Sequence, residues 1–578
     1  MVFTPPSWVP PMLDPPDTIS VPDFVKSELY GRYSVNGSRP MFTCGITGTS
    51  YTASEAFRRT DFLSRGLRKA LRWNVNEGTE WDRVVAIFSY NTVDYILAGH
   101  AVHKLSGIVT PASFTHSPQE LQYQLRLSGS KAIFTCIPLL ETALQAASAV
   151  GIPSQHVFIL PLPGAKADVP HITVEELINQ GQTLPDIASP PWVKGQGSRQ
   201  TAYLCFSSGT SGLPKAVMVS HRNVIANTLQ TATFDRVGRG ASKVTTQVAA
   251  GILPFSHIFG LVNIAHVAMY RGDELVVLPR FDFAQLLKTV EKFKIEQLSI
   301  VPPILIQIIS RQDECRRYDL SSVRHVFTGA APLGSETMDR IQTLYPNWKL
   351  GQGYGLTEAS PSVLSTSEHD PLPGSAGSLL PYTKAKLISL EGNEVTKYET
   401  RGELLIQSPS ITLGYLNDEK ENSRTFVWHN DGRWLKTGDE VIVRKSALGY
   451  EHFVVVDRIK ELIKVKGHQV APAELEAHIL DHPYVSDCAI IGVRDERSGE
   501  VPKAFIVKSA DLQKSIISDD DARKAIHKHV EEHKARHKWL RGGIEFVELI
   551  PKSPSGKILR RLIRDAEAKK QRPPQTKL

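Results

Sequence analysis

The sequence has 578 residues, enough for two or three domains rather than one compact core. Hydrophobic residues make up 41% and charged residues 22%, which excludes a disordered chain, a collagen and a coiled coil. The formal net charge is +7, and most of it lies after residue 556, where eight basic side chains occur with two acidic ones. The rest is close to neutral, so we expect no broad nucleic-acid-binding surface.

Several other classes are also not expected. No run of 18 apolar residues occurs, so no membrane span is predicted; the nearest run, 298–309, predicts a buried strand followed by a turn. The five cysteines form no C-x-x-C pair, which argues against a disulfide framework or a zinc knuckle and favours a reducing compartment. The proline-rich residues 1–14 predict an extended lead-in rather than a secretory signal.

Short apolar runs alternate with amphipathic segments along the first 450 or so residues. Buried strands are predicted at 84–90, 131–136, 156–160, 201–206, 274–278 and 325–328. Between them, residues 282–294 carry apolar side chains at helical spacing and predict an amphipathic helix. This alternation favours a parallel α/β core.

The pattern changes near Asp457, where we predict a domain boundary. Upstream, residues 402–407 and 449–456 are typical of a β-rich region. Downstream we predict a helix at 472–480 and strands at 488–493 and 504–507, which together make a small α+β domain. A large domain followed by a small one suits an enzyme with a mobile lid.

A loop rich in hydroxyls and glycine, SSGTSGLPK at 207–215, directly follows a predicted strand. Its backbone N–H groups and side-chain oxygens can surround phosphate oxygens, and its final lysine supplies positive charge. It does not match the Walker A pattern. A Ser/Gly surface linker is the alternative, and the Pro-Lys ending argues against it. By itself the loop indicates a phosphate site.

Four further motifs follow this loop in order: GYGLTE (353–358), TGD (437–439), DRIKELIKVKG (457–467) and PKSPSGK (551–557). Together the five resemble the signature motifs of the adenylate-forming superfamily, which includes acyl-CoA synthetases, firefly-type luciferases and peptide-synthetase adenylation domains. The chain is most similar to the 4-coumarate–CoA ligase-like branch, over residues 40–565. The resemblance implies that ATP activates a carboxylic acid as an acyl-adenylate and that coenzyme A then displaces AMP to form a thioester.

The resemblance also implies a domain organisation. We expect a lead-in at 1–40, an AMP-binding domain at 41–456, a lid domain at 457–565 and a basic tail at 566–578. The fold class is α/β: parallel α/β subdomains and a β-rich subdomain in the large domain, with a small mobile α+β domain at the C-terminus.

The nucleotide contacts follow by resemblance. Glu358 is expected to ligate Mg²⁺, a hard cation that prefers carboxylate oxygen, and a helix cap is its alternative role. Thr357 would contact the α-phosphate, while Asp439 and Arg458 would contact the ribose. The β- and γ-phosphates are assigned to Ser207, Ser208, Gly209, Thr210, Ser211 and Lys215, and the adenine and acyl sites to Gln352, Gly353 and Tyr354.

Lys557 is the residue expected to promote adenylation, because its ammonium could bridge the acyl carboxylate and the α-phosphate. Its neighbours Arg560 and Arg561 are expected to be solvated members of a basic tail. The resemblance implies that the lid rotates between the two steps. The residues implied to act in the second arrangement are Lys460, Lys464 and Gln469 for the adenylate, and Lys466 and Gly467 for coenzyme A.

The motif LPFSHIFG resembles the family's acyl-pocket motif and places His257 at a gating position. A histidine in an apolar stretch is otherwise usually a core residue. Phe259, Asn263 and Ala330 match pocket-lining positions, and Asn263 departs from the small hydroxyl-bearing residue of coumarate enzymes. Arg280 replaces a lysine of those enzymes and suits coenzyme A phosphate binding. We therefore expect an aromatic or medium-chain acid and a secondary-metabolite pathway.

Two rival functions remain. The first is adenylation for a carrier-protein acceptor: a peptide-synthetase-like module is disfavoured, because the sequence runs only 21 residues past Lys557 and residues 255–263 contain no aspartate for an amino group, and a stand-alone adenylation enzyme stays the alternative. A luciferase-type monooxygenase shares these motifs and stays open. A protein that only binds is not expected, since Lys557 and Glu358 are both present.

Two features lie outside these motifs. His529, His533 and His537 have the spacing of metal ligands on one helical face, but the surrounding lysines and arginine repel a cation and favour a solvated basic helix. The final residues Thr576, Lys577 and Leu578 approximate the Ser-Lys-Leu peroxisomal signal. We expect recognition by a peroxisomal import receptor, with the cytoplasm as the alternative location.

Overall fold

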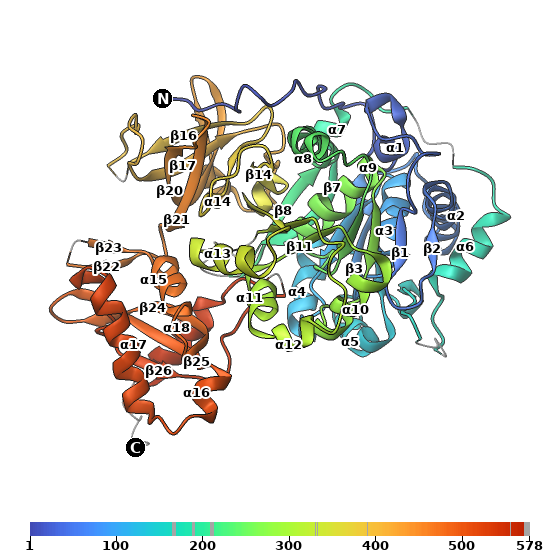
Figure 1. Ribbon diagram of the computed structural model, residues 1–578. Helices are drawn as coiled ribbons and strands as arrows, with labels where there is room; N and C mark the ends of the chain where they lie inside the picture. Colours follow the sequence, from blue (N-terminus) through green and yellow to red (C-terminus); the bar gives the residue numbers. More distant parts are fainter. Residues whose placement is uncertain are drawn as a thin grey trace, which may run out of the picture.

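The computed structural model describes residues 1–164, 169–187, 191–207, 213–329, 331, 333–389, 391–466, 468–554 and 556–570. A large N-terminal body is followed by a smaller C-terminal body, coloured orange to red in Figure 1. Within the described residues the strands form four sheets. The predicted α/β fold class, with a separate α+β domain at the C-terminus, is confirmed.

The first sheet has a parallel centre formed by consecutive βα units. In spatial order its strands are β18 (Gly414–Tyr415), β8 (Lys215–Ser220), β7 (Thr201–Ser207), β4 (Ile108–Ala112), β3 (Val84–Phe88), β5 (Ala132–Thr135) and β6 (Val157–Ile159). Strands β7, β4, β3, β5 and β6 run parallel, whereas β8 and β18 are antiparallel to their neighbours. Every residue of β3 is buried, as expected of a parallel strand covered on both faces.

The second sheet is also mainly parallel. Its order is β15 (Ser378–Leu379), β14 (Ser362–Ser365), β13 (Lys349–Gly355), β12 (His325–Thr328), β11 (Gln297–Ile300), β9 (Val248–Gly251), β10 (Glu274–Val277), β1 (Phe42–Cys44) and β2 (Ser50–Tyr51). The strands from β13 to β1 are parallel, with antiparallel additions at both edges. The six strands predicted from apolar runs are all present in these two sheets.

The other two sheets are mostly antiparallel. The β-rich region contains β16 (Lys384–Ile388), β17 (Gly402–Gln407), β20 (Gly432–Lys445), β19 (Phe426–His429) and β21 (Glu451–Arg458). The C-terminal body contains β23 (His468–Val470), β22 (Ile463–Val465), β25 (Gly499–Lys508), β24 (Val485–Asp495) and β26 (Ile544–Phe546). We call this C-terminal body, from residue 459 onward, the lid.

Helices cover both faces of the parallel sheets and both faces of the lid sheet (Figure 1). In the large body they are α1 (Val21–Lys26), α2 (Ala53–Leu71), α3 (Tyr95–Lys104), α4 (Pro118–Ser128), α5 (Leu140–Ala149), α6 (Val174–Gln182), α7 (Gln196–Arg199), α8 (His221–Ala241), α9 (Val267–Arg271), α10 (Phe283–Phe293), α11 (Pro302–Ser310), α12 (Gln312–Cys315), α13 (Ser335–Leu344) and α14 (Glu419–Thr425). In the lid they are α15 (Pro472–Leu480), α16 (Ala510–Lys514), α17 (Asp519–His533) and α18 (Arg560–Lys570). None of the described helices has the length and hydropathy needed to cross a membrane.

Local sequence explains where several helices begin. In α10, the Asp282 side chain accepts the N–H of Gln285, and the apolar stripe predicted at 282–294 is buried. The turn predicted at the end of 298–309 is wrong, because α11 follows strand β11 there. Pro302 and Pro303 occupy the first positions of α11, where the fixed φ of proline suits a helix and its missing N–H costs nothing.

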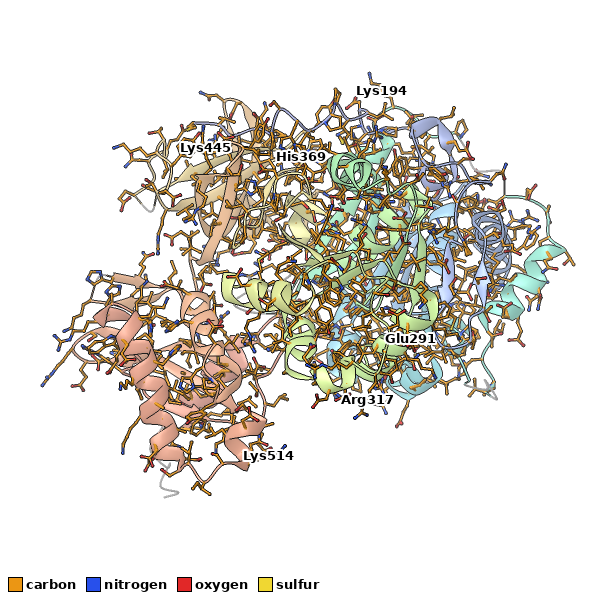
Figure 2. The ribbon with its side chains drawn as sticks, in the orientation of Figure 1. Lys194, Glu291, Arg317, His369, Lys445 and Lys514 are labelled. Atoms are coloured by element: carbon orange, nitrogen blue, oxygen red, sulfur yellow. The ribbon has the colours of Figure 1, made fainter. Side chains whose placement is uncertain are left out.

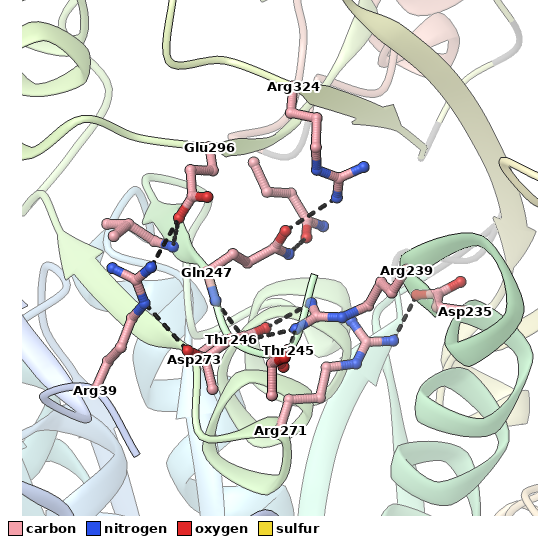
Figure 3. A network of polar contacts seen from close by, with 12 residues as sticks. Arg39, Asp235, Arg239, Thr245, Thr246, Gln247, Arg271, Asp273, Glu296 and Arg324 are labelled. Carbon is pink, nitrogen blue, oxygen red and sulfur yellow. Dashed lines mark hydrogen bonds and ion pairs between the residues drawn. The ribbon is translucent and has the colours of Figure 1, made fainter. Parts of the chain in front are cut away.

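Charged side chains differ in role between the surface and the sheet ends. Lys445, Lys514 and Arg317 project from the outer faces in Figure 2, and all three are exposed. In contrast, a polar network joins the segments that precede β9, β10, β11 and β12, so it lies at the amino ends of these parallel strands (Figure 3). Arg239 donates to both carboxylate oxygens of Asp273 at 2.9 and 2.8 Å. This buried pair ties α8 to the sheet.

Candidate active site

A cavity of about 1180 Å³ lies at the opposite ends of the same strands. Segments that follow β9, β10, β11 and β12 contribute Leu253, Arg280, Val301 and Gly329 to its wall, and the lid contributes Lys557. Ligands of open α/β sheets bind outside the carboxyl ends of the strands, so this cavity is the candidate active site.

The cavity brings together most of the predicted site residues that the structure describes. Those that line it are Ser207, Lys215, His257, Phe259, Arg280, Gly353, Tyr354, Thr357, Glu358, Asp439, Arg458, Lys460 and Lys557. Those that lie in the described part of the chain but not in the cavity wall are Asn263, Gln352, Lys464, Lys466 and Gln469. The predictions on Ser208, Gly209, Thr210, Ser211, Ala330 and Gly467 lie outside the described residues.

Glu358 is anchored by hydroxyl groups from two strands of the first sheet, β7 and β18. It lies in a short 3₁₀ turn, Thr357–Ala359, directly after β13. Its Oε1 accepts hydrogen bonds from Ser207 Oγ at 3.1 Å and Tyr415 Oη at 2.9 Å. These bonds hold the carboxylate at the cavity wall, where it could coordinate a hard cation. Their donors are side-chain hydroxyl groups, whereas a helix cap would accept backbone N–H groups.

Lys215 meets a partner that the motifs did not indicate. Its Nζ lies 2.5 Å from Glu421 Oε2 and 5.0 Å from the centre of the Tyr415 ring. The hydrogen bond from Lys215 lowers the pKa of Glu421. The positive charges of Lys215 itself, Arg424 and Lys460 act in the same direction. The Glu421 carboxylate therefore already neutralises the Lys215 ammonium at the cavity wall. Asp418 caps the helix that carries Glu421, and this cap is the only local sequence signal for its position.

The TGD motif forms a second polar corner of the cavity. Tyr354 Oη donates to Asp439 Oδ2 at 2.5 Å, and Arg458 Nε lies 3.6 Å from Oδ1. Asp439 and Arg458 are paired across β20 and β21, which explains why motifs distant in sequence meet here. Burial raises the pKa of Asp439, while Arg458 and the Tyr354 hydroxyl oppose this shift. A carboxylate has more than two acceptor sites, so Asp439 can still accept hydrogen bonds from the hydroxyl groups of a ligand.

Lys557 enters the cavity from the lid. It follows Gly556, whose φ of +81° favours glycine and where a β-carbon would lie 3.0 Å from Val301 Cγ2, so glycine suits the close approach of this tip to α11. Burial, with Arg458 as the next cause, lowers the pKa of Lys557 to about 8, against the opposing effect of Asp439 and Glu358. Since the charges of Arg458, Asp439 and Glu358 all act on this pKa, the ammonium lies close to the polar corner and to the Glu358 carboxylate.

The expectation that Arg560 is solvated is wrong. Its Nη2 lies 2.5 Å from Glu476 Oε2, and its Nε donates to the Ile490 carbonyl at 3.3 Å. The side chain is 14% exposed, because the start of α18 packs against β24 inside the lid. Arg561, in contrast, is exposed as expected.

The loop that contains His257 is held by Asn91, another residue that the sequence did not indicate. Asn91 Nδ2 donates to the Leu253 carbonyl at 2.9 Å, and its Oδ1 accepts the N–H of Phe255 at 2.8 Å. The Phe259 N–H points to His257 Nδ1 at 3.3 Å, which leaves the proton of a neutral imidazole on Nε2. Burial, with Lys557 nearby, lowers the pKa of His257 to about 4.

An apolar part of the cavity adjoins this loop. Phe259 and Phe327 have ring centres 6.3 Å apart, and Ile304 from α11 lines the same space. A β-carbon on Gly353 would lie 2.6 Å from Phe327 Cζ, so the glycine is needed for this packing. Aromatic and aliphatic walls beside a lysine and a neutral histidine suit an acid with an apolar tail.

Two family models match the chain. One described as "AMP-binding enzyme" covers residues 33–416, and one described as "AMP-binding enzyme C-terminal domain" covers residues 474–557. The chain belongs to the AMP-binding enzyme family. The predicted domain boundary between residues 456 and 457 falls in the interval between these two matched segments, 33–416 and 474–557, and stays a prediction.

Named relatives resemble this AMP-binding enzyme over their full length. It is 40% identical over 573 residues to acyl-CoA ligase AFT1-1 of Alternaria alternata, covering 98% of this chain and 97% of that protein. It is 39% identical over 570 residues to acyl-CoA ligase easD of Emericella nidulans, covering 97% and 99%. Both relatives support an adenylate-forming enzyme.

Solved structures share the fold. The anthranilate CoA ligase AuaEII in complex with anthranoyl-AMP gives a TM-score of 0.80 at 22% identity, covering 95% of this chain and 98% of that one. ATP-bound MatB from Rhodopseudomonas palustris gives a TM-score of 0.76 at 20% identity, covering 96% and 100%. At such low identity these likenesses concern the fold alone.

The remaining predicted residues of this AMP-binding enzyme lie away from the cavity wall. Lys464 and Lys466 are exposed on the lid near β22, so the present lid arrangement offers Lys557 rather than these lysines to the cavity. Gln352 is buried, and its Oε1 accepts the N–H of Leu333 at 3.0 Å; its adenine contact stays a prediction. Asn263 lies on the π-helix Phe259–His266, where its buried Oδ1 has no hydrogen-bond partner among the described residues.

Proposed function

We propose that this AMP-binding enzyme is an AMP-forming acyl-CoA ligase. In the first step a carboxylate oxygen attacks the α-phosphorus of ATP, and the bond from that phosphorus to pyrophosphate breaks. In the second step the sulfur of coenzyme A, having lost its proton, attacks the acyl carbon and AMP leaves. The observation that carries the proposal is the entry of Lys557 into a cavity shared with Glu358, Asp439 and His257.

The cavity residues suit the first step because that step brings two anions together. The Lys557 ammonium can lie between the acyl carboxylate and the α-phosphate and stabilise the charge that moves between them. Asp439 can accept the ribose hydroxyls, and Lys215 can contact the outer phosphates once it leaves Glu421. Glu358 would hold Mg²⁺, which supplies charge neutralisation on the polyphosphate.

The neutral His257 imidazole suits the region where the acid and the thiol meet. Its pKa of about 4 keeps it uncharged near neutral pH, so it neither traps the carboxylate nor repels Lys557. The apolar wall formed by Phe259, Ile304 and Phe327 favours an aromatic or medium-chain acid. A place in a secondary-metabolite pathway belongs to the same proposal.

The test is release of AMP and pyrophosphate from ATP, Mg²⁺ and coenzyme A across a panel of acids, with mass spectrometry of the acyl-CoA product. The panel contains cinnamic, phenylacetic and benzoic acids and straight-chain acids from butyric to palmitic. A CoA thioester from any member supports the ligase. Adenylate without thioester would favour a carrier-protein acceptor, and light emission with luciferin would favour the monooxygenase.

We also propose import into peroxisomes through Thr576, Lys577 and Leu578, which lie outside the described residues. The support is the sequence match, and the proposal requires Leu578 to carry a free carboxylate. A fluorescent protein fused to the N-terminus should mark peroxisomes, and removal of these three residues should leave it in the cytoplasm. Cytoplasmic signal from the full chain would contradict the proposal.

A further inference from the structure

Histidines from two helices meet on the lid, far from the cavity wall. His478 lies on α15, and His529 and His533 lie one turn apart on α17. The rings of His478 and His529 stack with centres 4.2 Å apart and planes 5° apart. One ring nitrogen from each of the three histidines lies within 4.8 Å of those from the other two.

This group differs from the one that helical spacing indicated. His537 lies beyond the end of α17 and stacks on His468 instead, with ring centres 4.4 Å apart. His478 takes its place, and it comes from a different helix. The cluster therefore joins α15 to α17.

Backbone carbonyls already bind one nitrogen of each ring. His478 Nε2 lies 3.2 Å from the His529 carbonyl, His529 Nε2 lies 3.2 Å from the His478 carbonyl, and His533 Nδ1 lies 2.9 Å from the His529 carbonyl. A carbonyl can only accept, so these nitrogens carry the protons and the other nitrogen of each neutral ring keeps a lone pair. Metal-binding histidines commonly show this arrangement, with the second nitrogen donating to a carbonyl.

The three lysines around the cluster have acidic partners, whereas the Arg536 guanidinium carbon lies 5.9 Å from the centre of the Trp539 ring. Lys534 and Lys538 both contact Glu474 Oε1, at 3.5 and 2.7 Å. Lys528 lies 3.6 Å from Glu532 Oε1. The repulsion expected from the sequence is therefore offset locally.

We propose that His478, His529 and His533 bind one divalent transition-metal ion of the Zn²⁺ type, which cross-links α15 and α17. Imidazole nitrogen is a preferred ligand of such ions, and two histidines one helical turn apart are a recurring half-site. Because the rings of His478 and His529 are parallel, both must turn for the three lone pairs to meet at one ion; these two rings then give up their carbonyl bonds, His533 keeps its own, and water completes the coordination.

One of the two cross-linked helices contacts the junction between the large body and the lid. The N–H of Ala473, in the first turn of α15, donates to Asp457 Oδ2 at 2.9 Å. Asp457 lies at the predicted boundary between the two bodies, on β21. Fixing α15 against α17 would therefore restrict the motion of the helix that contacts Asp457 at this junction. It would add no group to the cavity.

The experiment uses the full chain without a histidine tag, stripped of metal and free of ATP. Titration with Zn²⁺ by calorimetry should show one site per chain, and Co²⁺ should give the absorption of a nitrogen-ligated ion. His533→Ala removes an exposed side chain, so folding should persist, and Zn²⁺ affinity should fall at least about tenfold. His478→Ala should fall similarly, while the matched control His537→Ala should bind like the parent.

A second readout separates metal binding from general damage. Zn²⁺ should raise the thermal midpoint of the parent and of His537→Ala but not that of His533→Ala, because an ion that binds only the folded state stabilises it. Absence of stoichiometric binding, or equal loss in His537→Ala, would overturn the site. The test needs no acyl-CoA ligase activity, so its failure and failure of the proposed function are distinguishable.

Discussion

The two ends of the second sheet use charge in opposite ways. At the amino ends of the strands, Arg239 and Asp273 form a closed pair at 2.8 Å, and the Gln247 N–H donates to the same carboxylate (Figure 3). At the carboxyl ends, Lys557 lines the cavity, and burial lowers its pKa because no carboxylate offsets the loss of water fully. Closed pairs hold the fold together, whereas an under-compensated charge is typical of a site that acts on a substrate.

The largest expected effect comes from removing the charge at the cavity end. Lys557→Ala should slow adenylation by about 10²–10³-fold, because one electrostatic contact to the developing charge is lost. Thioester formation from supplied acyl-adenylate should be largely kept. Pyrophosphate release and single-turnover thioester formation measure the two steps separately.

The matched control is Arg561→Ala, an exposed cation in the first turn of α18, four residues after Lys557, which should behave like the parent. An equal loss in both half-reactions for Lys557→Ala would contradict the assignment of this lysine to the first step only.

At the other end, Arg239→Ala should lower the free energy of unfolding by about 3–5 kcal/mol, because it leaves the buried Asp273 carboxylate without its partner. Urea denaturation of the large body measures this change. Arg39→Ala is the control from the same network: Arg39 is 40% exposed and lies 3.5 Å from Glu296, so its loss should cost less than about 1 kcal/mol. Similar losses in the two variants would argue against a buried, closed pair.

The pH dependence sharpens the comparison further. Since the pKa of Lys557 is lowered to about 8, the ammonium is present below that pH and is lost as pH rises through it. The kcat/KM of adenylation at limiting ATP should therefore fall about tenfold per pH unit on the alkaline side. Lys557→Arg, which stays charged, should be slower but show no such limb. An alkaline limb kept in this variant would assign the titration to another group.

The smallest of these effects is expected at the polar corner. Tyr354→Phe removes the hydroxyl that donates to Asp439, and the KM for ATP should rise about tenfold while that for coenzyme A is unchanged. Tyr398→Phe is a matched control, because it removes a similar bond to Glu451, 2.9 Å long, outside the cavity wall. Equal changes in the KM for ATP would contradict a ribose-binding role for Asp439.

Much of the architecture could be predicted because it depends on local patterns. The helix expected at 472–480 begins and ends at those residues, and the strands expected from apolar runs are present. The 298–309 segment was only half predicted: the same apolar residues suit a strand or a helix, and Pro302 decides for a helix.

The site was predicted less completely, because many contacts join distant segments. Asn91 and Glu421 belong to no motif, and each is defined by a partner more than 150 residues away: Leu253 for Asn91 and Lys215 for Glu421. Arg560 has the local surroundings of a solvated tail, yet Glu476 pairs with it inside the lid.

By itself, the sequence determined the alternation of strands and helices, the order of the five motifs and the types of residue that could meet phosphate, ribose and an acid. These follow from periodicity and side-chain chemistry, which act over a few neighbouring residues. Only the tertiary structure decided that Lys557 lies in the cavity with a lowered pKa, that Lys215 pairs with Glu421, and that His478 rather than His537 joins the lid cluster. Burial and charge depend on all groups nearby in space, and the packing of sheets, helices and lid sets which groups those are.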